Sequence, residues 1–338
     1  MRVMIDRSSS NNNAFINFFS DAVRAAGAEV VPFQPYFQRL RTLDTLIFHW
    51  PALYMGKADF KTATKSLLRI MAARRLGKLK LVWVAHNVDE HDGPSSHPII
   101  LRRFLSELDG VIYLSHRSRD IIRAAYTLSD RTEELVTVHG VYEPVVPTSE
   151  RPAPSDGEAC RLLTFGLIRQ YKGYEALIDA AKECDPGRFT IGLMGRRFDP
   201  EYAAKLERDA ATNAALSFQL HDEHIEDADL ERAIDAANGV VLPYNRILNS
   251  GAAIHALSMN RPILVPNQGS MPELRELVGA DWITLYDGSL SYGHLEGFRS
   301  HLARMPTGSR PDLSALQWTR VQDDLRDFFA RINRKKSI

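Results

Sequence analysis

The chain has 338 residues, of which 44% are apolar and 25% charged, as in well-packed globular proteins of about two domains. Its 42 basic residues balance 42 acidic ones, so no global positive field favours nucleic acid as a partner. Two cysteines cannot form a disulfide framework, the N-terminus lacks a signal-peptide core, and no apolar run reaches the about 18 residues of a membrane span. We therefore expect a cytoplasmic protein that can still lie on the inner face of a membrane.

In the first half, short runs rich in Val, Ile, Leu and Phe alternate with longer amphipathic stretches, which predicts strand–helix units and a parallel sheet. The expected strands are 2–6, 29–33, 45–48, 79–85, 110–114 and 135–139. The expected helices are 14–26, 59–76, 98–107 and 117–127.

A linker and a second set of alternating elements follow. Residues 143–157 (EPVVPTSERPAPSDG) contain four prolines and little apolar content, as linkers do. The expected strands then are 161–166, 188–194, 216–220, 239–243, 262–266 and 282–286. The expected helices are 172–184, 199–211, 227–237, 249–259, 271–278 and 312–334. This pattern predicts two doubly wound α/β domains, 1–147 and 158–316, with ligands at the carboxyl ends of the strands in a shared cleft.

Residues 164–180 (TFGLIRQYKGYEALIDA) place two cations between a strand and a helix. Arg169 and Lys172 come just before the helix, whose dipole and free N–H groups also favour anions. The pattern is that of a diphosphate site, although exposed loop cations would give the same sequence.

A second helix start follows the strand that ends at Pro243. Asn249 or Ser250 caps this helix, and Gly251 lets a ligand approach the backbone. The same diphosphate is one candidate ligand, and a plain capped helix is the alternative.

Together these segments resemble a known family. FGxIRxYKGxxxLIxA, followed by LPY, NSG and ALSxxRPILxPxxGxxPEL, is similar to the donor domain of GT-B glycosyltransferases, which include bacterial mannosyltransferases of polysaccharide assembly. The resemblance covers most of residues 161–290 and implies that Arg169 and Lys172 bind the donor diphosphate. It also implies donor contacts from a loop at Gly195 and Arg196 and from Tyr244, Asn249, Ser250 and Gly251.

One departure from that family concerns its two glutamates, eight positions apart, which hold the donor in the common retaining members. Here His255 takes the second position and the first falls near Ile247. This points to a smaller group that resembles bacterial β-mannosyltransferases, in which an NSG loop replaces the glutamates, and to inversion at the anomeric carbon.

Residues 82–92 (VWVAHNVDEHD) resemble the same smaller group and carry the catalytic candidates. An inverting transfer needs a base for the acceptor hydroxyl, and Asp92 is the first candidate, with Asp89 and Glu90 as rivals. His86 and His91 are expected to orient a hydroxyl or to balance phosphate charge, and their spacing makes a metal site improbable.

Two further segments of the first half carry polar or basic side chains. Ser8, Ser9 or Ser10, after the first strand, is expected to contact acceptor or phosphate, while Asn12 or Asn13 caps the next helix. Residues 57–80 hold one acid and eight bases, which predicts contact with anionic lipid or simply a solvated helix face. The bases are Lys57, Lys61, Lys65, Arg69, Arg74, Arg75, Lys78 and Lys80.

The interpretation is a GT-B glycosyltransferase whose first domain binds the acceptor and whose second binds the nucleotide sugar. The resemblance implies that residues 317–338 pack back on the first domain. The expected reaction is hexosyl transfer, with mannose from GDP-mannose favoured, onto a lipid-linked oligosaccharide in exopolysaccharide synthesis, with no bound cofactor or metal. Two alternatives remain open: a retaining transferase with another sugar nucleotide such as a UDP-sugar, and a non-catalytic sugar-nucleotide-binding partner of an assembly complex.

Overall fold

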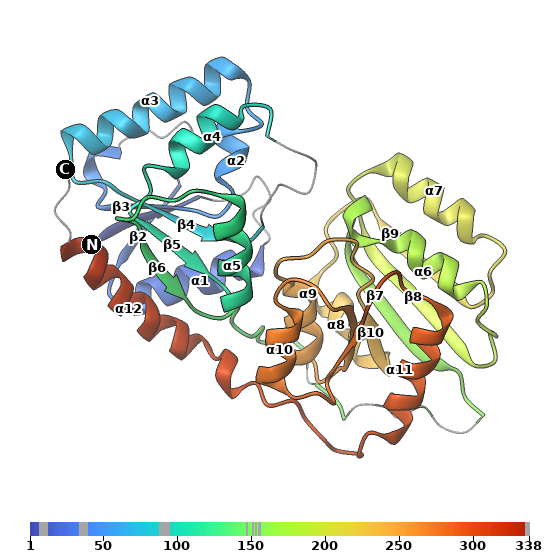
Figure 1. The fold of residues 1–338 in the computed structure, drawn as a ribbon. Helices are drawn as coiled ribbons and strands as arrows, with labels where there is room; N and C mark the ends of the chain where they lie inside the picture. The colour runs from blue at the N-terminus through green and yellow to red at the C-terminus, as the bar shows by residue number, and fades with distance from the viewer. Residues whose placement is uncertain are drawn as a thin grey trace. The chain divides into compact units, whose positions relative to one another are not determined.

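Two six-stranded sheets, each entirely parallel, organise the chain (Figure 1). The computed structural model describes residues 1–6, 13–33, 40–87, 95–146, 148–150, 152, 154 and 157–334, apart from the side chain of Arg41. The chain divides into unit 1, Met1–Gly140 with Leu316–Ile338, and unit 2, Val141–Ala315. In the described part of the chain, no helix is long and apolar enough to cross a membrane.

The sheet of unit 1 has the order β2-β1-β3-β4-β5-β6. Its strands are β1 (Arg2–Ile5), β2 (Glu29–Val31), β3 (Thr45–Phe48), β4 (Lys80–Ala85), β5 (Gly110–Tyr113) and β6 (Glu133–Val136). Every residue of β3, β4 and β5 is buried, as expected for a parallel sheet covered on both faces. Because β1, β3 and β4 are parallel neighbours, the residues that follow their carboxyl ends lie close together.

Helices cover both faces of this sheet. They are α1 (Ala14–Ala25), α2 (Pro51–Met55), α3 (Phe60–Leu76), α4 (Pro98–Leu105), α5 (His116–Ala125) and α12 (Trp318–Arg334). Figure 1 shows α2, α3 and α4 on one face and α1 with α12 on the other.

Helix α12, the last of the chain, packs against α1 and β6 of unit 1. Its ring Phe328 lies against Gly110, where a Cβ would come within 2.5 Å of the ring, and Trp318 lies against Gly140. The Thr137 hydroxyl donates to Asp324 Oδ2 at 2.7 Å. Helix α12 therefore completes the core of unit 1 although the whole of unit 2 precedes it in the chain.

The sheet of unit 2 has the order β12-β11-β10-β7-β8-β9. Its strands are β7 (Cys160–Ile168), β8 (Phe189–Arg197), β9 (Leu216–His221), β10 (Gly239–Val241), β11 (Ile263–Pro266) and β12 (Ile283–Tyr286). Its helices are α6 (Tyr174–Ala181), α7 (Pro200–Ala210), α8 (Asp227–Ala236), α9 (Gly251–Ser258), α10 (Met271–Val278) and α11 (Tyr292–Arg304).

Two helices, α2 of unit 1 and α11 of unit 2, were not expected from the sequence. Helix α11 contains Gly293 and Gly297, which weaken the helical signal, yet it buries Leu295, Phe298 and Leu302. A Cβ on Gly239 of β10 would come within 2.8 Å of the Phe298 ring, so tertiary packing holds the helix against the sheet.

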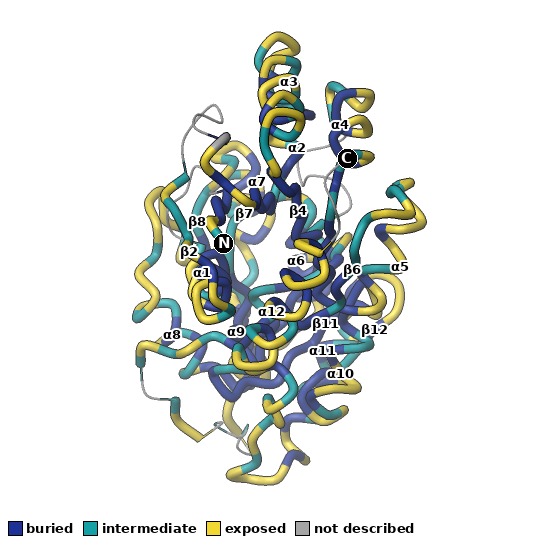
Figure 2. The backbone as a smooth tube through the Cα atoms, turned by 90° about the vertical axis from the view of Figure 1, so that its left-hand side faces the viewer, coloured by how far each residue is buried: buried dark blue, intermediate teal, exposed yellow. Residues whose placement is uncertain are grey.

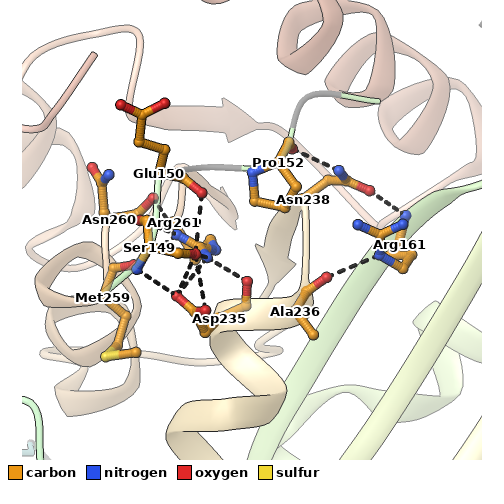
Figure 3. A network of polar contacts seen from close by, with 10 residues as sticks. All are labelled: Ser149, Glu150, Pro152, Arg161, Asp235, Ala236, Asn238, Met259, Asn260 and Arg261. Carbon is orange, nitrogen blue, oxygen red and sulfur yellow. Dashed lines mark hydrogen bonds and ion pairs between the residues drawn. The ribbon is translucent and has the colours of Figure 1, made fainter. Parts of the chain in front are cut away.

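The Pro-rich segment after residue 143 is tied to unit 2 along its described residues (Figure 3). Ser149 donates both its backbone N–H and its hydroxyl to Asp235, and Asn238 donates to the carbonyl of Pro152. Arg261, which is completely buried, pairs with the same Asp235 carboxylate at 2.7 Å. The network explains how a segment with little apolar content is held in place.

Candidate active site

The loop after β7 forms the first part of the candidate donor site. The strand ends at Ile168, a 3-10 turn covers Gln170–Lys172, and α6 begins at Tyr174. Between turn and helix, Gly173 has φ +71°, and a Cβ there would collide with the carbonyl oxygen of Pro243. The loop after β7 and the loop after β10 are thus in direct contact. A hydrogen bond also joins them, because Asn245 N–H donates to the Tyr171 carbonyl at 3.0 Å.

Lys172 is buried, and its partners are neutral groups. Its Nζ donates to Tyr244 Oη at 3.3 Å and lies 4.8 Å above the Tyr244 ring. Burial raises the pKa of Tyr244 to about 12, so the phenol is uncharged at neutral pH. Among the described residues, no carboxylate forms an ion pair with Lys172. A buried ammonium of this kind is costly unless an anion accompanies it, which fits a phosphate ligand.

The N-terminus of α9 joins this group through Ser250. Tyr244 Oη and Ser250 Oγ lie 2.9 Å apart, and Ser250 Oγ accepts the backbone N–H of Ala253 as the N-cap of the helix. The helix begins at Gly251, where the sequence places a helix start. One hydrogen-bonded chain therefore runs from the Lys172 ammonium to the positive end of a helix, and both favour an anion.

Arg169, the second predicted cation, stacks on an aromatic ring. Its Cζ lies 3.4 Å from the centroid of the Phe198 ring, in a cation–π contact, and Phe198 itself is 45% exposed. Stacking leaves the edge of a guanidinium able to bind oxygen atoms, as diphosphate binding requires. Phe198 was not among the predicted site residues, because the strand was expected to end at residue 194 and the structure extends it to Arg197.

The predicted loop at Gly195 and Arg196 is wrong, because both residues lie within β8. Strand pairing with β7 continues to the end of the element, joining Gly166 to Gly195 and Leu167 to Arg196. A Cβ on Gly195 would collide with the Gly166 carbonyl oxygen. The glycine therefore serves the close approach of two strands.

His255, which takes the place of a family glutamate, is itself paired with a carboxylate. Its Nε2 lies 3.1 Å from Oε1 of Glu231 on α8, and its ring stacks on Tyr142 at 4.7 Å. Glu231 is 2% exposed and also accepts the backbone N–H groups of Val145 and Val146. Burial lowers the pKa of His255, and Glu231 opposes this shift. Glu231 was not predicted as a site residue, because it comes from another helix, where it holds the start of the linker.

In unit 1, three neighbouring strands each end in a polar side chain. Asp6 follows β1, His49 follows β3 and His86 follows β4. The Asp6 carboxylate accepts the backbone N–H of His49 at 2.6 Å and that of Trp50 at 3.3 Å. His49 Nδ1 and His86 Nε2 are 2.7 Å apart.

Aromatic side chains enclose these strand ends. Phe15 of α1 meets His86 edge to face at 4.9 Å, and Trp50 stacks on the same imidazole at 5.3 Å. In this apolar setting burial raises the pKa of Asp6 to about 7, although its two backbone hydrogen bonds act in the opposite direction. Burial likewise lowers the pKa of His49 to about 3, so its imidazole is neutral.

The remaining predicted site residues lie outside the described part of the chain: Ser8, Ser9, Ser10, Asp89, Glu90, His91 and Asp92. His86 is described and half-buried. Asp6 and His49 were not predicted as site residues, although His49 comes directly after the apolar run TLIF and could have been noticed for that reason. Among the described residues, no group of three or more His, Cys, Asp or Glu side chains is placed to hold a metal ion.

Known proteins share this architecture. No family model matches the chain. Two solved structures cover 98% of it and are themselves covered to 99%: Anabaena HepE in complex with UDP, at 14% identity and a TM-score of 0.65, and a sucrose-phosphate synthase from Thermosynechococcus elongatus, at 13% and 0.67. Two parallel α/β units of this kind in one chain define the GT-B glycosyltransferase fold, which confirms the predicted fold class.

The sequence relatives are more specific than the fold. Two proteins of Xanthomonas campestris pv. campestris are 31% identical to this chain over 327 residues, which cover 94% of it and 87% of each relative. Both are named GDP-mannose:glycolipid 4-beta-D-mannosyltransferase. The chain belongs to this family of glycosyltransferases, and the predicted resemblance to mannosyltransferases is confirmed.

Proposed function

We propose that this protein transfers mannose from GDP-mannose to a lipid-linked saccharide, with inversion to a β linkage, during exopolysaccharide assembly. The observation that carries the donor and acceptor classes is the 31% identity, over nearly the whole chain, to enzymes named for GDP-mannose and a glycolipid. The polar contacts of unit 2 support the same reaction, because they gather positive charge where a nucleotide diphosphate would leave.

Unit 2 stabilises the leaving GDP in this proposal. Lys172, Arg169 and the N-terminus of α9 face the negative charge that grows on the diphosphate as the glycosidic bond breaks. Asn249, Ser250 and Gly251 belong to that helix start. Cations and a helix dipole supply this stabilisation without a resident metal, so the proposal includes none.

Unit 1 activates the acceptor. Asp92 removes the proton from the attacking hydroxyl, with Asp89 and Glu90 as rival bases, and these assignments rest on the sequence alone. His86 orients a hydroxyl at the carboxyl end of β4, where ligands of parallel sheets bind.

The same unit rests on anionic lipid through the outer face of α3. Figure 2 shows exposed stretches along α3. Lys61, Lys65 and Arg69 recur every fourth residue and are exposed, as are Leu68 at 63% and Leu76 at 69%. Cations interleaved with apolar side chains suit a lipid headgroup region.

Two of the eight predicted bases, Arg74 and Lys80, are not part of this face. Both pair with Asp109, and Lys80 is buried in β4. They hold α3 and β4 to the start of β5, so they serve the fold of unit 1 and are excluded from the proposed lipid contact.

The test is transfer from radiolabelled GDP-mannose to a lipid-linked oligosaccharide acceptor by the purified full chain, with UDP-, ADP- and dTDP-sugars in parallel. Transfer from GDP-mannose only is the expected outcome. Transfer from another sugar nucleotide would replace the donor assignment. Tight donor binding without transfer, against acceptors that a Xanthomonas relative accepts, would favour a non-catalytic binding role.

A further inference from the structure

Two histidines from neighbouring strand ends are joined directly through their rings. His49 Nδ1 and His86 Nε2 are 2.7 Å apart, within the range of a good hydrogen bond, with ring centroids at 5.0 Å and an interplanar angle of 28°. The contact links residues 37 positions apart, and β3 and β4 are adjacent in the sheet. The two strands therefore fix the distance between the rings.

His49 is an interior residue with few polar contacts. It is 1% exposed, and Phe19 meets its ring edge to face at 5.1 Å. Its backbone N–H is held by Asp6, which fixes the position of the residue at the end of β3. Its Nε2 is buried and has no hydrogen-bond partner in the described part of the chain. Of the two ring nitrogens, only Nδ1 has a polar partner there, and that partner is His86.

The hydrogen bond couples the proton positions of the two rings. A neutral imidazole carries one N–H, so one ring must donate and the other accept. If His49 kept its proton on Nδ1, its bare Nε2 lone pair would lie buried without a donor. If the proton is on Nε2, the N–H belongs to a ring that Phe15 and Phe19 meet edge to face, and aromatic rings can accept a weak hydrogen bond from N–H. The second arrangement makes His86 the donor through Nε2 and leaves the lone pair of His86 on Nδ1.

We propose that His49 is a positioning residue for His86: it accepts the Nε2–H of His86, fixes that ring, and thereby makes Nδ1 of His86 the nitrogen that accepts a hydrogen bond from a sugar hydroxyl. This inference rests on the proposed function, in which His86 contacts the substrate. His49 itself touches no substrate. Its contribution reaches the reaction only through the orientation and tautomer of His86.

The variant His49→Phe removes the hydrogen bond and keeps a ring among Phe15 and Phe19. Because this substitution also removes a buried nitrogen without a partner, we expect thermal stability at neutral pH to be unchanged or higher. Transfer should nevertheless fall about tenfold in kcat/KM, the effect of one lost hydrogen bond. His49→Asn, whose side chain can still accept a bond near the position of Nδ1, should recover most of the activity.

Two controls separate this role from others. His301→Phe removes one histidine hydrogen bond, to the Asp281 carbonyl, on α11 of unit 2 and should leave transfer unchanged. The double variant His49→Phe/His86→Ala should be no slower than His86→Ala alone, because His49 acts through His86. Additive losses in the double variant would overturn the inference.

Ring ¹⁵N NMR gives a readout that a purely structural role would not move. The His86 signals, assigned by their loss in His86→Ala, should show an Nε2–H tautomer in the wild type and a changed tautomer population in His49→Phe. An Nδ1–H tautomer in the wild type, or full activity in His49→Phe, would overturn the inference. Should His49→Phe fail to fold, the wild-type tautomer and His49→Asn still decide it. Failure of the proposed function would appear differently, as a wild-type protein that transfers no mannose.

Discussion

At the scale of single residues, the strongest sign of function is the buried charge of Lys172, which does not stabilise the fold. Lys172 lies among neutral partners, Tyr244 above all, while the exposed Lys182 has an ordinary ion pair with Asp179 at 2.6 Å. A protein retains a buried ammonium at some cost in stability. Binding of the diphosphate of a nucleotide sugar would explain why the buried ammonium of Lys172 is retained.

We expect Lys172→Ala to lower kcat for mannosyl transfer about a hundredfold to a thousandfold, since it removes a group that stabilises the leaving diphosphate. The fold should persist, because the substitution also removes a buried charge. Steady-state kinetics and a thermal melt measure the two effects. Lys182→Ala is the matched control and should retain wild-type turnover; near-normal turnover in Lys172→Ala would remove the diphosphate assignment.

The buried histidines of unit 1 predict a dependence of stability on pH. Burial lowers the pKa of His49 to about 3 and that of His139 to about 4, both below the value of an unfolded histidine, about 6.5. Unfolding therefore takes up protons between about pH 4 and 6.5, and the free energy of unfolding rises with pH across this window. Asp6 acts in the opposite sense, because its pKa of about 7 exceeds the unfolded value, and it offsets part of the rise.

The variant His49→Phe removes one of these two histidines, so we expect a smaller rise in the free energy of unfolding between about pH 4.5 and about pH 6.5 than in the wild type. Each pKa unit corresponds to about 1.4 kcal/mol. Urea denaturation at the two pH values measures the difference. Identical pH dependence in the two proteins would show that His49 titrates normally in the folded state.

At the scale of elements, α12 is the clearest case of a segment whose role depends on distant packing. Its buried face consists of Val321, Leu325, Phe328, Phe329 and Ile332. Amphipathic periodicity predicted the helix, but its partners, α1 and β6, come from the far end of the chain. The chain thus closes unit 1 only after unit 2 has been made.

Phe328→Ala should destabilise the protein by about 3–5 kcal/mol, the usual cost of truncating a buried aromatic, because the ring fills the space above Gly110. Chemical denaturation followed by circular dichroism measures the change. Asp327→Ala, an exposed neighbour on the same helix, should stay within about 0.5 kcal/mol of the wild type. Equal stability of the two variants would contradict the packing of α12 on β5.

The outer face of α3 gives a prediction about membranes. Replacing Lys61, Lys65 and Arg69 by Gln should weaken binding to vesicles that contain anionic lipid, by about 1 kcal/mol per charge. Co-flotation with anionic and with neutral vesicles measures it, and high salt should release the wild type. Lys182, Lys205 and Arg208 of unit 2, changed together to Gln, form the control set. Equal recovery of the wild type with neutral and anionic vesicles would contradict the proposed lipid contact.

At the scale of the whole molecule, the sequence predicts the strands well because buried parallel strands are continuous apolar runs, as in KLVWVA of β4. It fails where a strand outlasts its apolar run, as β8 does through Arg196 and Arg197. It also fails where contact depends on strand order or on another helix. Asp6, His49 and His86 meet because β3 lies between β1 and β4, and Glu231 reaches His255 from α8. Neither the strand order nor the contact between helices can be predicted from the local sequence.

Stereochemistry is the property of the whole reaction that the resemblance links to the two glutamates of the retaining members. In place of the second glutamate stands His255, whose Nε2 is engaged by Glu231, and that carboxylate also holds two backbone N–H groups of the linker. The carboxylate is thus committed to the fold of unit 2. Neither residue supplies the carboxylate that holds the donor in the retaining members, which is why inversion is proposed here, with a base from unit 1.

We therefore expect an α-linked GDP-mannose donor to give a β-mannoside, with Asp92 as the general base. A positioned base contributes about a hundredfold to ten-thousandfold, so Asp92→Asn should nearly abolish transfer while affinity for GDP-mannose stays close to that of the wild type. NMR of the anomeric proton and carbon of the product measures the linkage, and calorimetric titration measures donor affinity. An α product would exclude inversion. A β product from a fully active Asp92→Asn enzyme would instead move the base to Asp89 or Glu90, because both lie in the same segment after β4 and the same chemistry would then need only a neighbouring carboxylate.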